Sequence, residues 1–163
     1  PAEALENARL EGVAVHKMVE LDCKGDLDTD TLPGWMEGHW QAWQKFKRES
    51  GFECHSSEQR LYHTAVRYAG TCDLVGKTPR MKNVRGLSLI DIKRSFYAGR
   101  AIGVQLMAYA TAWEAEGRPP IHNRFALRLD KSGDYRLMPF TDREDWSVFL
   151  ACLTLHRYKE RNP

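Results

Sequence analysis

The chain has 163 residues, of which 42% are hydrophobic and 28% are charged, and its formal net charge is +2. This length fits one compact domain, so we expect residues 1–163 to form a single unit. The composition excludes a disordered or fibrous protein. No apolar run approaches the roughly 20 residues of a membrane-spanning helix, and the first residues lack the layout of a secretory signal. We therefore expect no membrane partner and an intracellular, cytoplasmic location in a phage or bacterial setting, with the oligomeric state left open.

Apolar residues at helical spacing predict two helices early in the chain, over residues 2–21 and 35–49, joined by a polar loop. Gly12 interrupts the first helix, and we expect it to allow a close approach of that helix to the sheet. Residues 58–76 alternate in period two, which predicts a hairpin or a bent strand pair. The second half predicts the following elements in chain order: a polar loop over 77–86, a strand over 87–93, a helix over 100–116, strands over 124–129 and 135–140, and a last helix capped by Thr141 or Asp142.

The strongest chemical signal is Asp91-Ile92-Lys93 on the predicted strand. Side chains alternate across a strand, so Asp91 and Lys93 share a face while Ile92 points to the other. A second carboxylate, Asp73, falls in the preceding strand, and His16 lies on the first helix. Two carboxylates and an imidazole suit a divalent ion, Mg²⁺ or Mn²⁺, and leave the lysine to act on water. The alternative is a solvated salt bridge between Asp91 and Lys93.

Four short motifs come in the order found in the RecB-type branch of the PD-(D/E)xK nucleases. They are GxxxH at Gly12 and His16, GTxD at Gly70 and Asp73, DIK from Asp91 to Lys93, and QxxxY at Gln105 and Tyr109. The chain resembles the compact phage exonucleases of that branch and is similar to mitochondrial genome maintenance exonucleases. The resemblance implies an α/β fold with a restriction-endonuclease-like core, in which a small mixed β-sheet is flanked by α-helices.

The resemblance also implies roles for individual residues. Metal ligation is expected from His16, Asp73, Asp91 and the Ile92 carbonyl. Lys93 is expected to orient or deprotonate the attacking water, and Gln105 and Tyr109 to align the site and the DNA backbone. Glu58 and Glu20 are second-tier candidates, with surface or supporting carboxylates as the alternative interpretation.

The four cysteines contain no CxxC pair, which indicates free thiols rather than a zinc ribbon or a disulfide framework. Some relatives hold an iron–sulfur cluster through one early and three clustered late cysteines. Because this chain has a single late cysteine, Cys152, no iron–sulfur cluster is expected.

Basic residues gather between positions 77 and 100, where seven of them accompany one acidic residue, Asp91. This run brackets the predicted metal site, so we expect it to lie along a phosphate backbone, with a solvated face as the alternative. The candidate DNA contacts are Arg80, Lys82, Arg85, Arg94 and Arg100.

The sequence as a whole predicts a metal-dependent exonuclease that hydrolyses phosphodiester bonds in single- or double-stranded DNA with an end. Two alternatives stay open: a structure-selective endonuclease or junction resolvase on the same core, and a catalytically inactive nucleic-acid-binding module. The intact set of Asp73, Asp91 and Lys93 argues against the inactive module, because such a module has no use for carboxylates beside a lysine.

Overall fold

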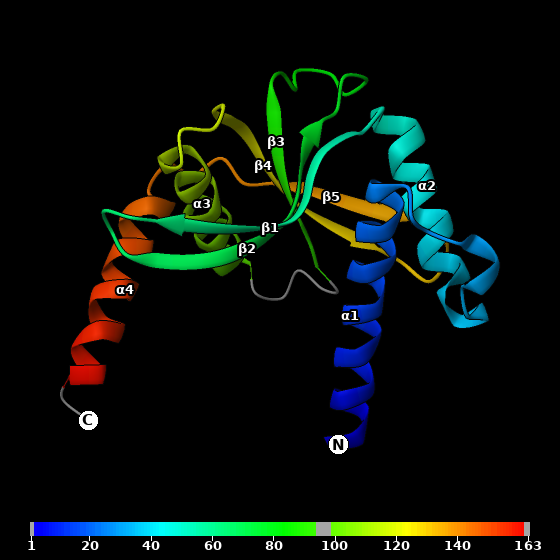
Figure 1. The fold of residues 1–163 in the computed structure, drawn as a ribbon, viewed down its shortest axis with the longest axis horizontal. Helices are drawn as coiled ribbons and strands as arrows, with labels where there is room; N and C mark the ends of the chain where they lie inside the picture. The colour runs from blue at the N-terminus through cyan, green and yellow to red at the C-terminus, as the bar shows by residue number, and fades with distance from the viewer. Residues whose placement is uncertain (1, 94–98, 162–163) are drawn as a thin grey trace.

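The computed structural model describes residues 2–93 and 99–161, which form one five-stranded mixed sheet with helices on both of its faces (Figure 1). The helices are α1 (Ala2–Lys24), α2 (Glu37–Ser50), α3 (Arg100–Ala115) and α4 (Asp145–Arg161), with short 3₁₀ turns at Thr29–Thr31 and Gly34–Met36. The strands are β1 (Glu53–His63), β2 (Tyr68–Lys77), β3 (Leu87–Ile92), β4 (Ile121–Leu129) and β5 (Tyr135–Pro139). The predicted α/β class, with a small mixed sheet flanked by helices, is confirmed.

The strands lie in sequence order, β1-β2-β3-β4-β5. Neighbouring strands pair antiparallel except β3 and β4, which are parallel and are joined through α3. A parallel pair needs a crossover connection, and α3 supplies it. The β3 end that carries Asp91 therefore leads into the segment before α3, and α3 folds back over the sheet.

Two apolar clusters cover the two faces of the sheet. One packs α1 and α2 against the sheet through residues such as Trp43, Phe46 and Ile90, and the other packs α3 through Leu89 and Trp113. Alternation along β3 accounts for this division, because Ile90 and Leu89 point to opposite faces. Asp91 lies two residues after Leu89, so its side chain is on the same face of the sheet, the face covered by α3.

The first hairpin differs from the sequence prediction. Strand β1 begins at Glu53, earlier than expected, and residues 64–67 form the turn rather than continuing a strand. Arg67 ends that turn with a left-handed φ of +60°. The turn contains no glycine, proline, asparagine or aspartate, which are the residues that usually mark a turn in a sequence.

Helix α4 starts at Asp145, four residues after Thr141 and three after Asp142, the two predicted caps, and packs against α3 and the first hairpin (Figure 1). Its first residue, Asp145, forms a buried ion pair with Arg124 of β4, at 2.8 Å between Oδ2 and Nη1. The rings of Trp146 and Phe149 contact the ring of Tyr68 on β2, Trp146 in a tilted arrangement and Phe149 edge-on. Within the described part of the chain, no helix combines the length and the apolar character needed to cross a membrane.

Candidate metal centre

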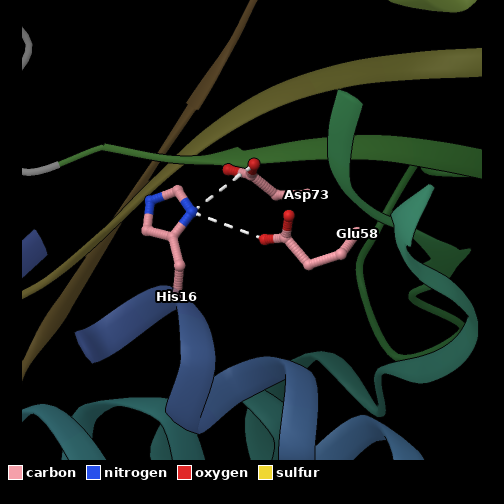
Figure 2. Close-up of side chains that lie close together, drawn as sticks. All are labelled: His16, Glu58 and Asp73. Carbon is pink, nitrogen blue, oxygen red and sulfur yellow. Dashed lines mark ion pairs between the residues drawn. The ribbon is translucent and has the colours of Figure 1, made fainter. Parts of the chain in front are cut away.

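His16, Glu58 and Asp73 meet beside the sheet although they come from α1, β1 and β2 (Figure 2). One nitrogen and two carboxylate oxygens of these residues lie within 4.8 Å of one another. His16 Nδ1 is 3.5 Å from Asp73 Oδ1 and 3.7 Å from Glu58 Oε1. This group could hold a metal ion.

The register of the first hairpin explains why Glu58 joins the group. Ser57 pairs with Leu74 and Gln59 pairs with Cys72, so Glu58 lies opposite Asp73 on the neighbouring strand. Like charges directly opposite each other destabilise a sheet. The sequence placed Glu58 in the second tier, whereas the structure makes it one of the three donors.

The backbone at Glu58 is also unusual. Its φ is +48°, in the left-handed region that residues with a side chain rarely adopt. Such a conformation costs about 1–3 kcal/mol and tends to occur at functional sites. The strained residue is thus the one that brings a carboxylate to the group.

Strand β2 separates from β3 at Asp73. The β2–β3 ladder ends at the pair Leu74 and Ile90, and beyond it Asp73 Oδ2 accepts a hydrogen bond of 2.6 Å from the backbone N–H of Ile92. The side chain of Asp73 therefore satisfies a backbone donor that the partner strand does not reach. This bond fixes the carboxylate between β1 and β3.

The ring of His16 is oriented by the Ile92 carbonyl, which lies 3.0 Å from Nε2. A neutral imidazole that donates its Nε2 proton to this carbonyl presents the Nδ1 lone pair to Asp73 and Glu58. A carbonyl on the far nitrogen is the usual way in which a metal-binding histidine is oriented. The Ile92 carbonyl, which the resemblance gives as a metal ligand, orients the His16 ring in this arrangement.

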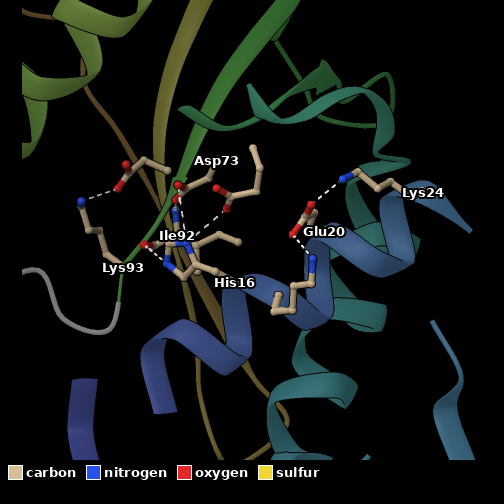
Figure 3. A network of polar contacts seen from close by, with 9 residues as sticks. His16, Glu20, Lys24, Asp73, Ile92 and Lys93 are labelled. Atoms are coloured by element: carbon tan, nitrogen blue, oxygen red, sulfur yellow. Dashed lines mark hydrogen bonds and ion pairs between the residues drawn. The ribbon is translucent and has the colours of Figure 1, made fainter. Parts of the chain in front are cut away.

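Asp91 and Lys93 lie next to the group and begin a chain of polar contacts toward α3. Lys93 Nζ is 2.7 Å from Asp91 Oδ2 and donates to Gln105 Oε1 at 2.8 Å. Gln105 Nε2 in turn donates to the hydroxyl of Tyr109 at 2.9 Å. Figure 3 shows Lys93 beside Ile92 and His16. The predicted shared face of Asp91 and Lys93, and that of Gln105 and Tyr109, are both present.

The electrostatics of this region favour an additional cation. Asp91 is 3% exposed, and its Oδ2 meets Lys93 in an ion pair rather than in a well-directed hydrogen bond. Burial, and then the charge of Asp73, raise the pKa of Asp91 to about 6 despite Lys93. Burial and the charge of Asp73 also raise the pKa of Glu58. Among the described residues, Asp91, Asp73 and Glu58 bring three carboxylates together and Lys93 pairs directly with Asp91, so this donor set fits a divalent ion.

His16 responds to the same charges. Burial lowers the pKa of its imidazole, but the hydrogen bond and charge of Asp73, with the charges of Glu58 and Asp91, outweigh burial and raise it overall. The carboxylates therefore favour the protonated form of the His16 imidazole when no ion is bound. A histidine that binds a metal must be neutral, because the ligating nitrogen needs its lone pair, so a bound ion and this proton exclude each other.

The two glycines of the motifs differ in what they do. A Cβ atom at Gly70 would lie 2.5 Å from Cε1 of Tyr109, so glycine lets the tyrosine ring lie on β2. A Cβ atom at Gly12 would meet nothing within 4 Å. The expected close approach of α1 to the sheet at Gly12 is therefore wrong, and the residue instead borders open space.

That open space consists of two cavities on either side of His16. One, of about 190 Å³, lies between α1 and the β4–β5 turn, and its walls include Val15, Lys93 and Lys131. The other, of about 330 Å³, is bordered by Glu58 and Glu20. Gly12 and His16 line both cavities.

Glu20 lies one helical turn after His16 but outside the donor group. Its carboxylate pairs with Lys17 Nζ at 2.8 Å and with Lys24 (Figure 3), and these hydrogen bonds lower its pKa. The structure thus supports the surface alternative for this second-tier residue.

The basic residues do not surround the metal centre as expected. Arg80, Lys82 and Arg85 are exposed on the β2–β3 loop, which precedes β3, whereas Asp91 lies near the other end of that strand. The four residue steps from Leu87 to Asp91 alone separate the two regions by about 13 Å. Arg80 Nη1 instead donates to the Arg48 carbonyl at the end of α2, at 2.6 Å. Arg100 is exposed at the start of α3, and Arg94 lies outside the described residues.

The chain matches no protein-family model, and a search of curated proteins gave no match either.

Proposed function

We propose that the protein is a metal-dependent deoxyribonuclease that removes nucleotides from a DNA end by phosphodiester hydrolysis. The observation that carries this proposal is the position of Lys93, whose ammonium contacts Asp91 and Gln105 directly beside the His16–Glu58–Asp73 group. A metal site next to a positioned lysine suits hydrolysis of a charged phosphodiester. The motif resemblance supports the same activity.

Each residue has a role in this proposal. His16, Glu58 and Asp73 hold the ion, with Asp91 adding negative charge nearby. The bound Mg²⁺ or Mn²⁺ would supply Lewis acidity toward the phosphate and water. Lys93 pairs with Asp91 and donates one of its three N–H groups to Gln105, and another N–H group would orient the attacking water. Tyr109 holds the Gln105 amide and so positions Lys93.

The imidazole nitrogen bears on the choice of metal. Carboxylates alone suit Mg²⁺ or Mn²⁺, and a nitrogen donor shifts the preference toward Mn²⁺. We therefore propose that Mn²⁺ binds more tightly than Mg²⁺ at this centre.

The smaller cavity favours an exonuclease over an endonuclease. Its walls include His16, Lys93 and Lys131, and it lies beside the metal centre. A pocket next to the reacting phosphate suits the terminal nucleotide of a strand better than a continuous duplex. The same proposal includes a cytoplasmic location, where DNA and reduced thiols coexist.

The decisive experiment digests end-labelled linear DNA and circular DNA, single- and double-stranded, in Mg²⁺, in Mn²⁺ and in EDTA. We expect metal-dependent release of terminal nucleotides from linear DNA and intact circles. Asp73→Asn should abolish the release, while Asp30→Asn, at an exposed aspartate of the early loop, should leave it unchanged. Cut circles would support the endonuclease alternative, and DNA binding without cleavage would support the inactive module.

The basic loop provides a separate test of how DNA is bound. We predict that neutralising Arg80, Lys82 and Arg85 together weakens DNA binding and flattens its salt dependence, since each lost phosphate contact lowers the log–log slope by about 0.9 on duplex or 0.7 on single strands. Because the loop lies away from the centre, DNA longer than the site should be affected more than a short oligonucleotide. An unchanged slope would assign the loop to a solvated face.

A further inference from the structure

A third cavity lies on the α3 face of the sheet, where β3 begins. Its volume of about 610 Å³ exceeds that of either cavity beside His16. This volume falls in the range of about 300–1,000 Å³ that is usual for small-molecule sites. The walls come from four parts of the chain: the β2–β3 loop, α3, the start of β4 and the segment from Pro139 to Arg143. The proposed nuclease chemistry gives this cavity no role.

Helix α3 separates this cavity from the metal centre. Gln105 and Tyr109 form the chain of polar contacts to Lys93 on one side of the helix. Met107 and Thr111 line the cavity. Each follows one of those two residues by two positions, which is a rotation of about 200° around the helix axis. A ligand in the cavity would therefore lie across α3 from the residues proposed to act on DNA.

The loop that forms one wall of the cavity is fixed to β4. The side-chain amide of Asn123 donates to the Arg85 carbonyl at 2.8 Å and to Ser88 Oγ at 3.3 Å. Gly86 has a φ of +72°, and a Cβ atom there would lie 2.4 Å from Nδ1 of His122. Glycine at this position thus lets the histidine ring lie against the loop. These contacts hold the wall in place, so a ligand has little ordering to impose when it binds.

The walls combine apolar surface with basic groups at the exposed edge. Met107, Ile121 and Phe140 contribute apolar side chains. Lys82 and Arg143 also line the cavity, and both are exposed. Within the described part of the chain, neither of these two cations forms an ion pair. Apolar walls suit the faces of a flat ring system, and two cations without partners suit a phosphate.

The other charged groups of the wall are already engaged. The guanidinium of Arg124 pairs with Asp145 and donates to the carbonyls of Gly103 and Asp142. Glu114 Oε1 accepts a hydrogen bond of 2.9 Å from the backbone N–H of Ile121. An anionic group of a ligand would therefore bind at the exposed cations rather than at the buried guanidinium.

We propose that this cavity is a nucleotide-binding site, with the base between the apolar walls and the phosphate at Lys82 and Arg143. The side chains of Asn83 and Thr111 belong to the same walls and provide hydrogen-bonding groups for the base or the sugar. The same ligand chemistry could come from a free mononucleotide or from one nucleotide of a DNA strand.

The inference does not depend on the proposed nuclease activity. Binding in this cavity needs no metal ion, because its cations are side chains of the protein. The cavity can therefore be tested in EDTA, where a strand of DNA would also stay intact if the protein is a metal-dependent nuclease.

The test titrates the full chain in EDTA with dAMP, deoxyadenosine and inorganic phosphate, and follows the methionine methyl groups by NMR. Met107 lines the cavity, whereas Met18 and Met36 lie in the core between the sheet and helices α1 and α2. We expect dAMP to shift the Met107 signal, assigned with Met107→Leu, and to leave the signals of Met18 and Met36 in place. Deoxyadenosine and phosphate should each bind at least about tenfold more weakly than dAMP, because each lacks half of the contacts.

Two matched double variants locate the phosphate. Lys82→Glu combined with Arg143→Glu should weaken dAMP binding at least about tenfold, since charge-assisted contacts are lost. Lys159→Glu combined with Arg136→Glu makes the same change of charge at exposed positions outside the cavity and should leave the affinity unchanged.

A short single strand of thymidylate distinguishes the two sources of the ligand. Displacement of dAMP from the cavity would assign it to a DNA strand, and retention of dAMP would assign it to a free mononucleotide. The proposal is overturned if dAMP leaves the Met107 signal unchanged, shifts Met18 instead, or binds both double variants equally. If the Lys82 and Arg143 double variant fails to fold, the Met107 signal of the wild-type chain still decides the outcome, because it does not depend on those substitutions.

Discussion

Two buried carboxylates in this molecule each face a basic side chain, and their surroundings differ. Asp145 meets Arg124, whose guanidinium also donates to the carbonyls of Gly103 at 3.0 Å and Asp142 at 2.6 Å. Asp91 meets Lys93, but its Oδ2 accepts no well-directed hydrogen bond and it experiences the charge of Asp73. The first pair is fully hydrogen-bonded, and it holds the start of α4 against β4. Around the second pair, the acidic groups carry more charge than the single Lys93 ammonium in contact with Asp91 can neutralise.

The comparison separates an ion pair that holds a fold together from one that belongs to a site. A buried pair is tolerated when every donor and acceptor is satisfied, as around Arg124. A carboxyl group with a strongly raised pKa beside further acidic groups, as at Asp91, is typical of functional sites. Four predictions test this distinction, in order of decreasing effect.

The largest difference should be in activity. We predict that Lys93→Ala lowers DNA cleavage by at least about 100-fold, the range for loss of a residue that moves or orients a proton. Manganese binding should survive, because the ammonium contacts Asp91 and Gln105 rather than the donor group. Single-turnover cleavage and calorimetric titration measure the two effects, with Lys159→Ala, at an exposed lysine of α4, as the matched control. Near-normal turnover would remove Lys93 from the proposed mechanism.

Stability should show the reverse order. Arg124→Ala leaves Asp145 buried without its partner and should cost about 3–5 kcal/mol of unfolding free energy. Lys93→Ala should cost about 1 kcal/mol or less, because Asp91, with its raised pKa, can take up a proton in place of the lost ammonium. Urea unfolding in EDTA near neutral pH compares them. Equal losses would mean that the two pairs are alike.

The third prediction concerns pH. The folded pKa of Asp91, about 6, lies above its ordinary value of 3.8. The stability that this group contributes is therefore complete below its ordinary pKa and is lost as the pH rises through the folded pKa. Relative to Asp91→Asn, the metal-free wild type should lose about 2 kcal/mol between about pH 4 and pH 7. Denaturation series in EDTA measure this, and parallel curves for the two proteins would contradict it.

The smallest effect concerns the backbone at Glu58. Glycine adopts a positive φ without strain, so Glu58→Gly should be more stable than Glu58→Ala by about 1 kcal/mol. Both variants lose the carboxylate and should lose manganese affinity to the same extent. Comparing these two variants isolates the strain from the charge. An alanine variant as stable as the glycine variant would show that the site stores no backbone strain.

The sequence supported much of the fold because its signals are local. Helical spacing and strand alternation predicted the α/β order, and alternation alone placed Asp91 and Lys93 on one face. The sequence could not predict that Glu58 belongs to the candidate metal group, because that depends on the register of the first hairpin. That register is set by a turn whose residues, Thr64 to Arg67, carry no turn signal.

Two further errors came from long-range geometry. The basic loop is adjacent in sequence to the strand that carries Asp91, but it joins the opposite end of that strand. Gly12 indicates a special position, yet spacing alone could not distinguish a close contact from an open cavity. In both cases the missing information was how a segment lies relative to the sheet.

The three donors also bear on the kinetics of folding. His16, Glu58 and Asp73 are separated by 42 and 15 positions in the chain, so an ion can meet all three only after α1 has docked on the finished hairpin. Contacts that form this late stabilise the folded state more than the folding transition state, and such contacts change the unfolding rate. An ion bound here would therefore prolong the lifetime of the folded chain against a protease while leaving its folding rate nearly unchanged.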